Sequence, residues 1–228
     1  EYGNPSLANI HLAPSQGNMG DRINMALALG AGLRNMELIQ LSCAVAPFSI
    51  QMQMPIKNNG VVFINKEGKR FTNEFSEASS DRRITDDILA QTDAECFAVY
   101  NDTIYQDFMA IEEKDFFDEY RMNGIDNSGT VLKADTLEEL AELMGVDVAA
   151  FTETMANLKT DGIGNEKVVE LAGTYKEGPY YAVVVTPGVM DTLGGLDADT
   201  SARVLNTEGK PIKGLYAAGE VIGNTQGA

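Results

Sequence analysis

Apolar positions recur along the chain with two periods, one typical of helices and the other typical of strands. Asp21 is the predicted N-cap of the first helix. Thr136 and Glu139 form a capping-box pattern, Gly145 is predicted to end the helix that follows, and Asp147 is predicted to cap the next one. The pattern predicts helices over residues 21–33, 86–91, 136–145 and 147–159, with an acidic helical region around residues 103–121.

Short apolar runs predict strands at residues 36–41, 61–64, 96–100, 180–186 and 214–217. Residues 65–69 predict a hairpin-type turn between the second strand and Arg70. Residues 188–195 end in Gly194 and Gly195 and predict a tight turn, at which a backbone without Cβ atoms could approach a ligand closely. The mixture of helices and strands, without an internal repeat, predicts an α+β fold.

The balance of acidic and basic residues argues against some classes of function. The 228 residues include 34 acidic and 17 basic side chains, which give a formal net charge of −17 at pH 7. Nucleic-acid binding requires a basic surface, so it is not expected. No apolar run reaches the roughly 18 residues of a membrane-spanning helix. Cys43 and Cys96 lie in apolar surroundings and read as structural thiols, and the single histidine, His11, gives no basis for a metal site.

Four sequence blocks stand in a recognisable order. They are GDRINMALALGAGLRNMELIQ at residues 20–40, VVFINKEGKRFTNE at residues 61–74, DTLEELAELMGVDVAAFTETMANL at residues 135–158, and a final stretch that contains the Gly194–Gly195 pair and AAGE at residues 217–220. Together they resemble the fumarate reductase and succinate dehydrogenase flavoprotein family, especially its soluble fumarate-reductase-like branch. The resemblance implies FAD as the cofactor.

The resemblance also implies an architecture. Residues 42–186 correspond to the capping, or substrate, domain of the family, and residues 1–41 and 187–228 to parts of its FAD-binding domain. No G-x-G-x-x-G follows a strand, so the site for the ADP half of FAD is expected to be incomplete in this chain. The chain is therefore expected to be a fragment that is inactive alone, does not retain FAD, and has the remainder of the FAD-binding domain as its partner.

The residues that the resemblance assigns to FAD lie in the first and last blocks. Glu220, which ends AAGE, is expected to face the ribityl region of the flavin. The full set of expected cofactor-binding residues is Gly20, Asp21, Gly194, Gly195, Ala218, Gly219 and Glu220.

The family delivers a proton from a buried arginine that follows the RFTNE hairpin by a few residues. Here Arg82 is the first choice and Arg83 the close alternative. The other interpretation is a solvated arginine pair whose charge is balanced by neighbouring aspartates at positions 81, 86 and 87. Arg70, within the hairpin itself, is expected to be structural and to pair with Asn73 and Glu74.

The expected substrate-binding residues are Ser42, Met54, Lys57, Asp191 and Thr192. Ser42 and Asp191 stand where the family has two histidines that hold a substrate carboxylate. Met54 occupies the position of a glutamate in the proton relay, with apolar packing as its alternative role, and Lys57 that of an arginine. Two like charges at about 4 Å repel by roughly 1–4 kcal/mol, so Asp191 argues against a C4 dicarboxylate. A neutral, cationic or hydroxyl-bearing substrate fits better, although Asp191 could equally cap its own turn.

These observations favour part of an FAD-dependent oxidoreductase that transfers hydride between flavin and the C=C bond of a small organic substrate. One alternative is a non-redox ligand- or partner-binding domain derived from the cap. Another is a ketosteroid-dehydrogenase-like enzyme, whose mark would be a large apolar pocket around Phe48, Met52 and Met54. A soluble protein is expected, either cytoplasmic or exported, without a membrane span.

Overall fold

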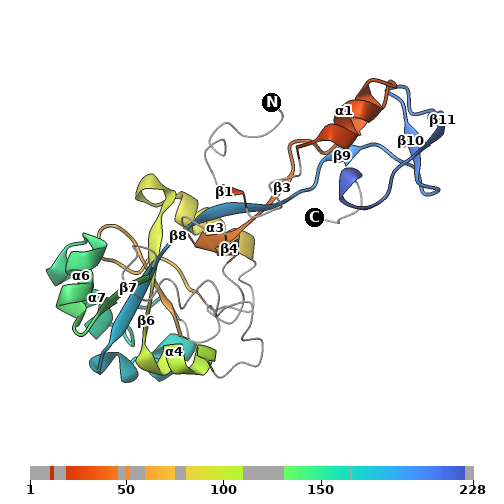
Figure 1. Cartoon of the computed structure of the whole chain (residues 1–228). Coiled ribbons are helices and arrows are strands. Elements are labelled where there is room, and N and C mark those ends of the chain that lie inside the picture. The colour runs from red at the N-terminus through yellow and green to blue at the C-terminus, as the bar shows by residue number, and fades with distance from the viewer. Residues whose placement is uncertain are drawn as a thin grey trace. The chain divides into compact units, whose positions relative to one another are not determined.

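The structure, a computed structural model, describes residues 11–12, 19–45, 50–51, 60–74, 81–109, 131–164 and 166–223. The chain divides into two compact units. Glu1–Leu41 and Gly188–Ala228 form the terminal unit, and Ser42–Pro187 form the central unit. Figure 1 shows the elements of both, with strands β3 (Ile39–Val45) and β8 (Tyr180–Thr192) connecting them along the chain.

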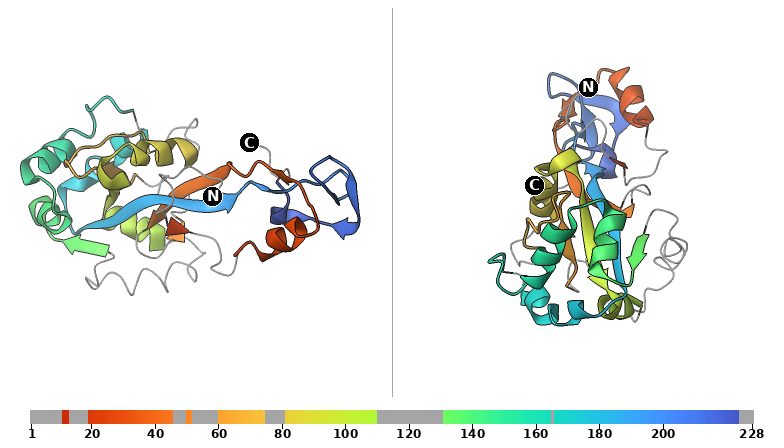
Figure 2. Two further views of the ribbon diagram at one scale, coloured as in Figure 1. Left: turned by 90° about the horizontal axis from the view of Figure 1, so that it is seen from above. Right: turned by 90° about the vertical axis from the view of Figure 1, so that its left-hand side faces the viewer.

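A mixed sheet is organised around β8. Within the described residues its strand order is β4–β3–β8–β6–β5, and β7 and β1 also pair with β8. β6 runs antiparallel to β8 in a register that places Cys96 opposite Val185 and Asn101 opposite Tyr180. Figure 2 shows β3 and β8 running side by side. The remaining strands are β1 (His11–Leu12), β4 (Ile50–Gln51), β5 (Val62–Ile64), β6 (Cys96–Asn101) and β7 (Val131–Ala134).

Helices cover the part of this sheet that lies in the central unit. The core includes the fully buried strands β5 and β6 together with Phe151 and Leu140 from the helices. The capping box is present as predicted, because Thr136 Oγ1 accepts from the Glu139 N–H and the Glu139 carboxylate accepts from the Thr136 N–H. The helices are α3 (Asp81–Leu89), α4 (Asp102–Met109), α6 (Leu137–Met144), α7 (Val148–Ala156) and α8 (Glu166–Leu171).

The terminal unit has a small core of its own, in which Val204 and Leu196 pack with Ala26 of the helix. Its elements are α1 (Asp21–Leu27), β2 (Leu33–Arg34), β9 (Gly195–Leu196), β10 (Arg203–Leu205), β11 (Pro211–Tyr216) and the short 3₁₀ helix η4 (Gly219–Val221). β2 pairs with β9, and β10 pairs with β11. None of the described helices has both the length and the apolar character needed to cross a bilayer.

The α+β class and most predicted elements are confirmed, and five details of the predicted elements are wrong. Gly20, with φ 79°, is the N-cap of α1, and Asp21 is its first helical residue. That helix ends at Leu27 rather than residue 33, and β3 begins at Ile39 rather than residue 36. α3 begins at Asp81, five residues before its predicted start. Residues 188–192, predicted as a turn, instead extend β8, because β1 pairs with β8 at Gly188.

Candidate functional site

A cavity of about 300 Å³ lies in the terminal unit. The start of α1, the end of β8 and the residues around η4 surround it. Of the seven residues predicted to bind FAD, five line this cavity: Gly20, Asp21, Gly194, Ala218 and Glu220. Segments about 170 residues apart in the sequence thus converge on one open cavity.

The glycines of this region serve different purposes. Gly20 and Gly219 have φ angles of 79° and 81°, which residues with a Cβ rarely adopt, and a Cβ added at either would meet no atom within 4 Å. A Cβ at Gly194 would meet the backbone of residues 35 and 36, and one at Gly195 would meet the backbone of Val221. The two glycines therefore also allow backbone segments of the protein itself to pack, and their predicted close approach to a ligand stays a prediction.

The charges around the cavity indicate which part of FAD it would suit. Asp21 and Glu220 contribute two exposed carboxylates, and Arg22 contributes one guanidinium. Carboxylates accept hydrogen bonds from hydroxyl groups and repel a pyrophosphate. The volume lies at the lower end of the range for ligand pockets. The cavity therefore fits a hydroxyl-bearing portion of FAD, such as the ribityl chain, better than its phosphates.

Two predicted substrate-binding residues lie at the end of β8. Thr192 is exposed and lines the same cavity as the predicted cofactor residues. Asp191 is half-buried and does not line it. A third predicted substrate residue, Ser42, belongs to the central unit. The other two, Met54 and Lys57, lie outside the described residues, as do Phe48 and Met52.

Ser42 occupies β3 in the central unit and is 2% exposed. Its Oγ finds no hydrogen-bond partner among the described residues, and the same holds for Oγ1 of Thr186 on β8, which is 7% exposed. Sequence reasoning missed Thr186. The available signal was a hydroxyl within the otherwise apolar run of residues 182–187.

The two candidate arginines both lie in α3, and only the side chain of Arg83 is among those described. The Arg83 guanidinium donates to Asp87 Oδ2 at 2.8 Å, to Thr72 Oγ1 at 3.2 Å and to the Asn73 carbonyl oxygen at 2.5 Å. The contact with Asp87 belongs to the alternative interpretation, and the choice between the two interpretations stays a prediction. The three contacts tie Arg83 to the hairpin and leave Arg82 as the residue to test for proton delivery.

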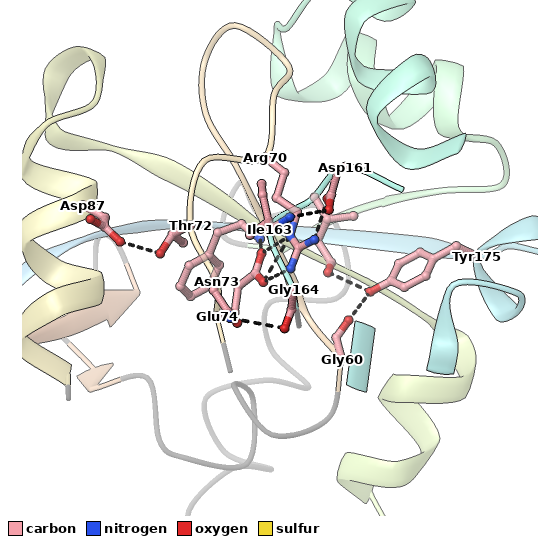
Figure 3. Close-up of polar contacts among 12 residues, drawn as sticks. Gly60, Arg70, Thr72, Asn73, Glu74, Asp87, Asp161, Ile163, Gly164 and Tyr175 are labelled. Atoms are coloured by element: carbon pink, nitrogen blue, oxygen red, sulfur yellow. Dashed lines mark hydrogen bonds and ion pairs between the residues drawn. The ribbon is translucent and has the colours of Figure 1, made fainter. Parts of the chain in front are cut away.

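A buried ionic cluster holds the hairpin itself (Figure 3). Arg70 Nη2 lies 2.7 Å from Glu74 Oε2, and the side chains are 1% and 0% exposed. Arg70 Nη1 also contacts Asp161 Oδ2 at 2.5 Å, a partner that the sequence did not reveal. Burial lowers the pKa of Arg70, and the bonds to Glu74 and then Asp161 outweigh it, so the pKa is raised. The prediction that Arg70 is structural is confirmed for its pairing with Glu74.

Other titratable residues of the sheet bond to or stack on neighbouring groups of the protein. Tyr180 donates to the Tyr175 carbonyl oxygen at 2.8 Å, and the ring of Tyr181 stacks between those of Tyr100 and Tyr105. Cys43 and Cys96 are buried thiols. No group of three His, Cys, Asp or Glu side chains suited to a metal ion occurs in the part of the chain that the structure describes.

Comparison with known proteins matches residues 2–228 to the family described as FAD binding domain. The chain is 33% identical to a fumarate reductase (cytochrome) of Shewanella frigidimarina, over 98% of this chain and 38% of the relative. It is 28% identical to a 3-oxosteroid 1-dehydrogenase of Mycolicibacterium smegmatis, over 92% of this chain and 42% of the relative. The solved open conformation of a flavocytochrome c3 fumarate reductase superposes with a TM-score of 0.77 at 27% identity, covering 96% of this chain and 37% of that structure. The chain thus spans less than half the length of these relatives.

Proposed function

The chain belongs to the FAD binding domain family, whose cofactor is FAD, and we propose that it contributes to reducing the C=C bond of an organic substrate other than a plain C4 dicarboxylate. The observation that carries this proposal is the convergence of five predicted cofactor residues on one cavity. The similarity to a fumarate reductase supports the direction of the reaction.

The residues around the cavity have specific proposed roles. Glu220 and Asp21 accept hydrogen bonds from the ribityl hydroxyls of FAD, and Gly20 and Gly219 provide backbone conformations that other residues would strain. When bound, reduced FAD supplies a hydride to one carbon of the double bond. Gly195 supports the cavity indirectly through its packing against Val221.

The substrate side of the reaction involves different residues. Arg82 is proposed to deliver the proton, since the guanidinium of Arg83 is already bonded to Asp87, Thr72 and the Asn73 backbone. The half-buried carboxylate of Asp191 disfavours a substrate carboxylate by like-charge repulsion. Ser42 offers a neutral hydroxyl where the family resemblance places a histidine. Met54 and Lys57 keep their proposed substrate contacts.

We further propose that the central unit is the capping domain and that the terminal unit works with additional FAD-binding polypeptide. Met19, Met25 and Leu29 at α1 are 75%, 64% and 63% exposed. Apolar side chains exposed together on one short segment are typical of an interaction surface. A further part of an FAD-binding domain would cover them and extend the cavity.

A second candidate function is dehydrogenation, the reverse transfer, on a bulky ring substrate. It is favoured by the 28% identity to a 3-oxosteroid 1-dehydrogenase. The two directions are separated by supplying either a reduced viologen with unsaturated substrates or an oxidising dye with saturated ketones, and by measuring which reaction the protein supports.

The cavity is tested by filling it. Ala218→Phe places a ring in the cavity, Glu220→Gln removes a carboxylate, and Ala149→Phe adds the same ring at an exposed position of α7 in the central unit. Titration of FAD fluorescence and flavin absorbance after gel filtration measure binding in the protein combined with the additional FAD-binding polypeptide, because this chain alone is expected not to retain FAD. We expect Ala218→Phe to abolish FAD binding, Glu220→Gln to weaken it roughly threefold to tenfold, and Ala149→Phe to leave it unchanged.

Equal FAD binding by all three variants would reject this cavity as the FAD site. Absence of flavin binding with retained ligand binding would favour the non-redox alternative.

A further inference from the structure

A second cavity, of about 570 Å³, lies wholly within the central unit and has no part in the proposed function. It is bounded by the N-terminal end of α6, the second half of α7, the 3₁₀ helix η3 (Thr174–Lys176) and the start of β8. Figure 1 shows α6 and α7 side by side in this unit. The volume falls within the range of pockets that hold small organic ligands.

One part of the lining is apolar. Leu137 contributes to it from α6, Met155 and Ala156 from α7, and Ala172 from the segment after α8. Met155 is buried, and Leu137 and Ala172 are half-buried. Side chains of this kind stabilise a bound hydrocarbon group by removing it from water. A ligand that fits this cavity therefore has an apolar portion.

Two hydroxyl groups of the lining have already used their hydrogen. Tyr180 Oη donates to the Tyr175 carbonyl oxygen at 2.8 Å, and Thr152 Oγ1 donates to the Val148 carbonyl oxygen at 2.8 Å. A hydroxyl carries one hydrogen and two lone pairs, so each of these groups keeps only the capacity to accept. Tyr180 is 4% exposed, so its remaining acceptor lies among buried groups. The polar part of a fitting ligand therefore donates hydrogen bonds.

The charges of the lining add to this preference. Asp135 and Glu138 line the cavity, and neither carboxylate forms a hydrogen bond or an ion pair within the described ranges. Among the described residues of the lining, Lys176 is the one base, and it is exposed. Burial, and then Glu138 and Glu177, raise the pKa of the Tyr180 hydroxyl, which agrees with a negative potential at this acceptor. Two acids against one base favour a positively charged ligand.

We propose that this cavity binds a small organic cation, an amine or a guanidine that carries an apolar group. The charged group donates hydrogen bonds to Asp135, Glu138 and Tyr180, and the apolar group packs against Leu137 and Met155. An anion would meet two carboxylates, and a wholly apolar molecule would leave the acceptors without donors. The carboxylates decide the sign of the ligand's charge, while the volume and the apolar side chains decide its size and the character of the rest of the molecule.

Calorimetric titration of the whole chain with three molecules of similar frame tests the role of charge. They are phenethylamine, which is a cation, phenethyl alcohol, which is neutral, and phenylacetate, which is an anion. We expect the amine to bind about tenfold more tightly than the alcohol, and phenylacetate not to bind. Equal affinity for the amine and the alcohol would overturn the inference, because the carboxylates would then have no effect on binding.

Charge variants test the assigned carboxylate. Glu138→Gln should weaken phenethylamine binding roughly threefold to tenfold. Glu142→Gln is the matched control, because Glu142 is exposed on the same helix and does not line the cavity, so binding should be unchanged. Lys176→Gln removes the repelling charge and should strengthen binding roughly twofold to threefold. A purely structural role of these side chains would not produce opposite changes in affinity, and equal binding by Glu138→Gln and Glu142→Gln would contradict the inference.

A variant that fills the cavity tests the location. Ala156→Phe adds a ring at a lining position of α7, and Ala149→Phe adds the same ring two turns earlier on that helix, where the residue is also exposed but does not line the cavity. We expect Ala156→Phe to abolish phenethylamine binding and Ala149→Phe to leave it unchanged, with circular dichroism confirming that both variants fold. Retained binding in Ala156→Phe would reject this cavity as the site. If Ala156→Phe does not fold, Glu138→Gln and Lys176→Gln still decide the question.

These titrations need no flavin, because none of the predicted cofactor residues lines this cavity. Failure of the chain to bind phenethylamine would reject the inference and leave the proposed function untouched. Failure of the FAD experiments would reject the proposed function and leave this cation site in place.

Discussion

Replacing Glu74 by glutamine tests how the hairpin of residues 65–74 is held. The Glu74 carboxylate accepts from Arg70 Nε at 3.0 Å, from Arg70 Nη2 at 2.7 Å and from the Phe63 N–H at 2.9 Å. Glutamine keeps the size of the side chain and removes the charge. Because an arginine guanidinium stays protonated in proteins, Arg70 cannot become neutral to relieve the loss.

The size of the expected loss in stability follows from the burial of the Arg70–Glu74 pair. Arg70 is 1% exposed and Glu74 is 0% exposed at the side chain. Removing one partner from a buried ion pair costs about 3–5 kcal/mol. Asp161 remains 2.5 Å from Arg70 Nη1 and is 16% exposed, so it compensates part of this cost. We therefore expect Glu74→Gln to lower the free energy of unfolding by about 3 kcal/mol.

Urea denaturation followed by circular dichroism measures this change. Glu138→Gln is the control, because Glu138 is exposed at the start of α6 and its loss of charge should change stability by less than about 0.5 kcal/mol. The double variant Arg70→Met with Glu74→Leu removes both charges and should regain much of the lost stability. A loss below about 1 kcal/mol in Glu74→Gln would refute the assignment of the pair as a buried, mutually dependent unit.

Four further predictions concern other parts of the fold. Gly195→Ala should destabilise the terminal unit by about 1–3 kcal/mol, seen as faster amide exchange there, because its Cβ would meet the Val221 backbone. Gly173→Ala, which meets no atom within 4 Å and has φ −66°, should be neutral or slightly stabilising. Thr136→Ala removes the capping box of α6 and should cost about 1 kcal/mol by urea denaturation, a result that an unchanged midpoint would contradict. Burial, and then Asp102, raise the pKa of Tyr181 to about 12. The contribution of the protonated Tyr181 hydroxyl to the stability of the fold is therefore fully present below pH 10 and is lost as the pH rises through 12. Tyr181→Phe should reduce the loss of stability between those pH values, while the raised pKa values of Tyr175 and Tyr180 preserve part of it.

The sequence predicted best where local chemistry decides the structure. The capping box at Thr136 and the buried strand at Cys96–Asn101 depend on residues close together in the chain, and both are present. The extension of β8 through Gly188 depends on β1, a partner more than 170 residues away, and no local pattern could reveal it. At Gly188, strand pairing rather than local sequence propensity therefore decides the structure.

The candidate site shows the same division. Motif resemblance brought together Gly20, Gly194 and Glu220, which do line one cavity, because the family preserves the order of these blocks. The sequence did not reveal a further need for glycine at Gly194, which comes from the backbone of Asn35 and Met36, because that contact exists only in the folded unit. Asp161 was missed because its role depends on its ion pair with Arg70, which is distant in the sequence. Thr186 was missed because no sequence motif shows that its hydroxyl lacks a hydrogen-bond partner among the described residues.

Under the proposed function, the charges of the chain favour a neutral substrate over a dicarboxylate. The formal net charge of −17 would repel an anion at long range, but screening beyond about 8 Å at physiological salt limits that effect. Local groups must therefore decide, and the proposed substrate residues offer the Asp191 carboxylate and the Ser42 hydroxyl where the family resemblance places two histidines. Under the proposed function, a substrate without a negative charge avoids the aspartate, which a carboxylate cannot do.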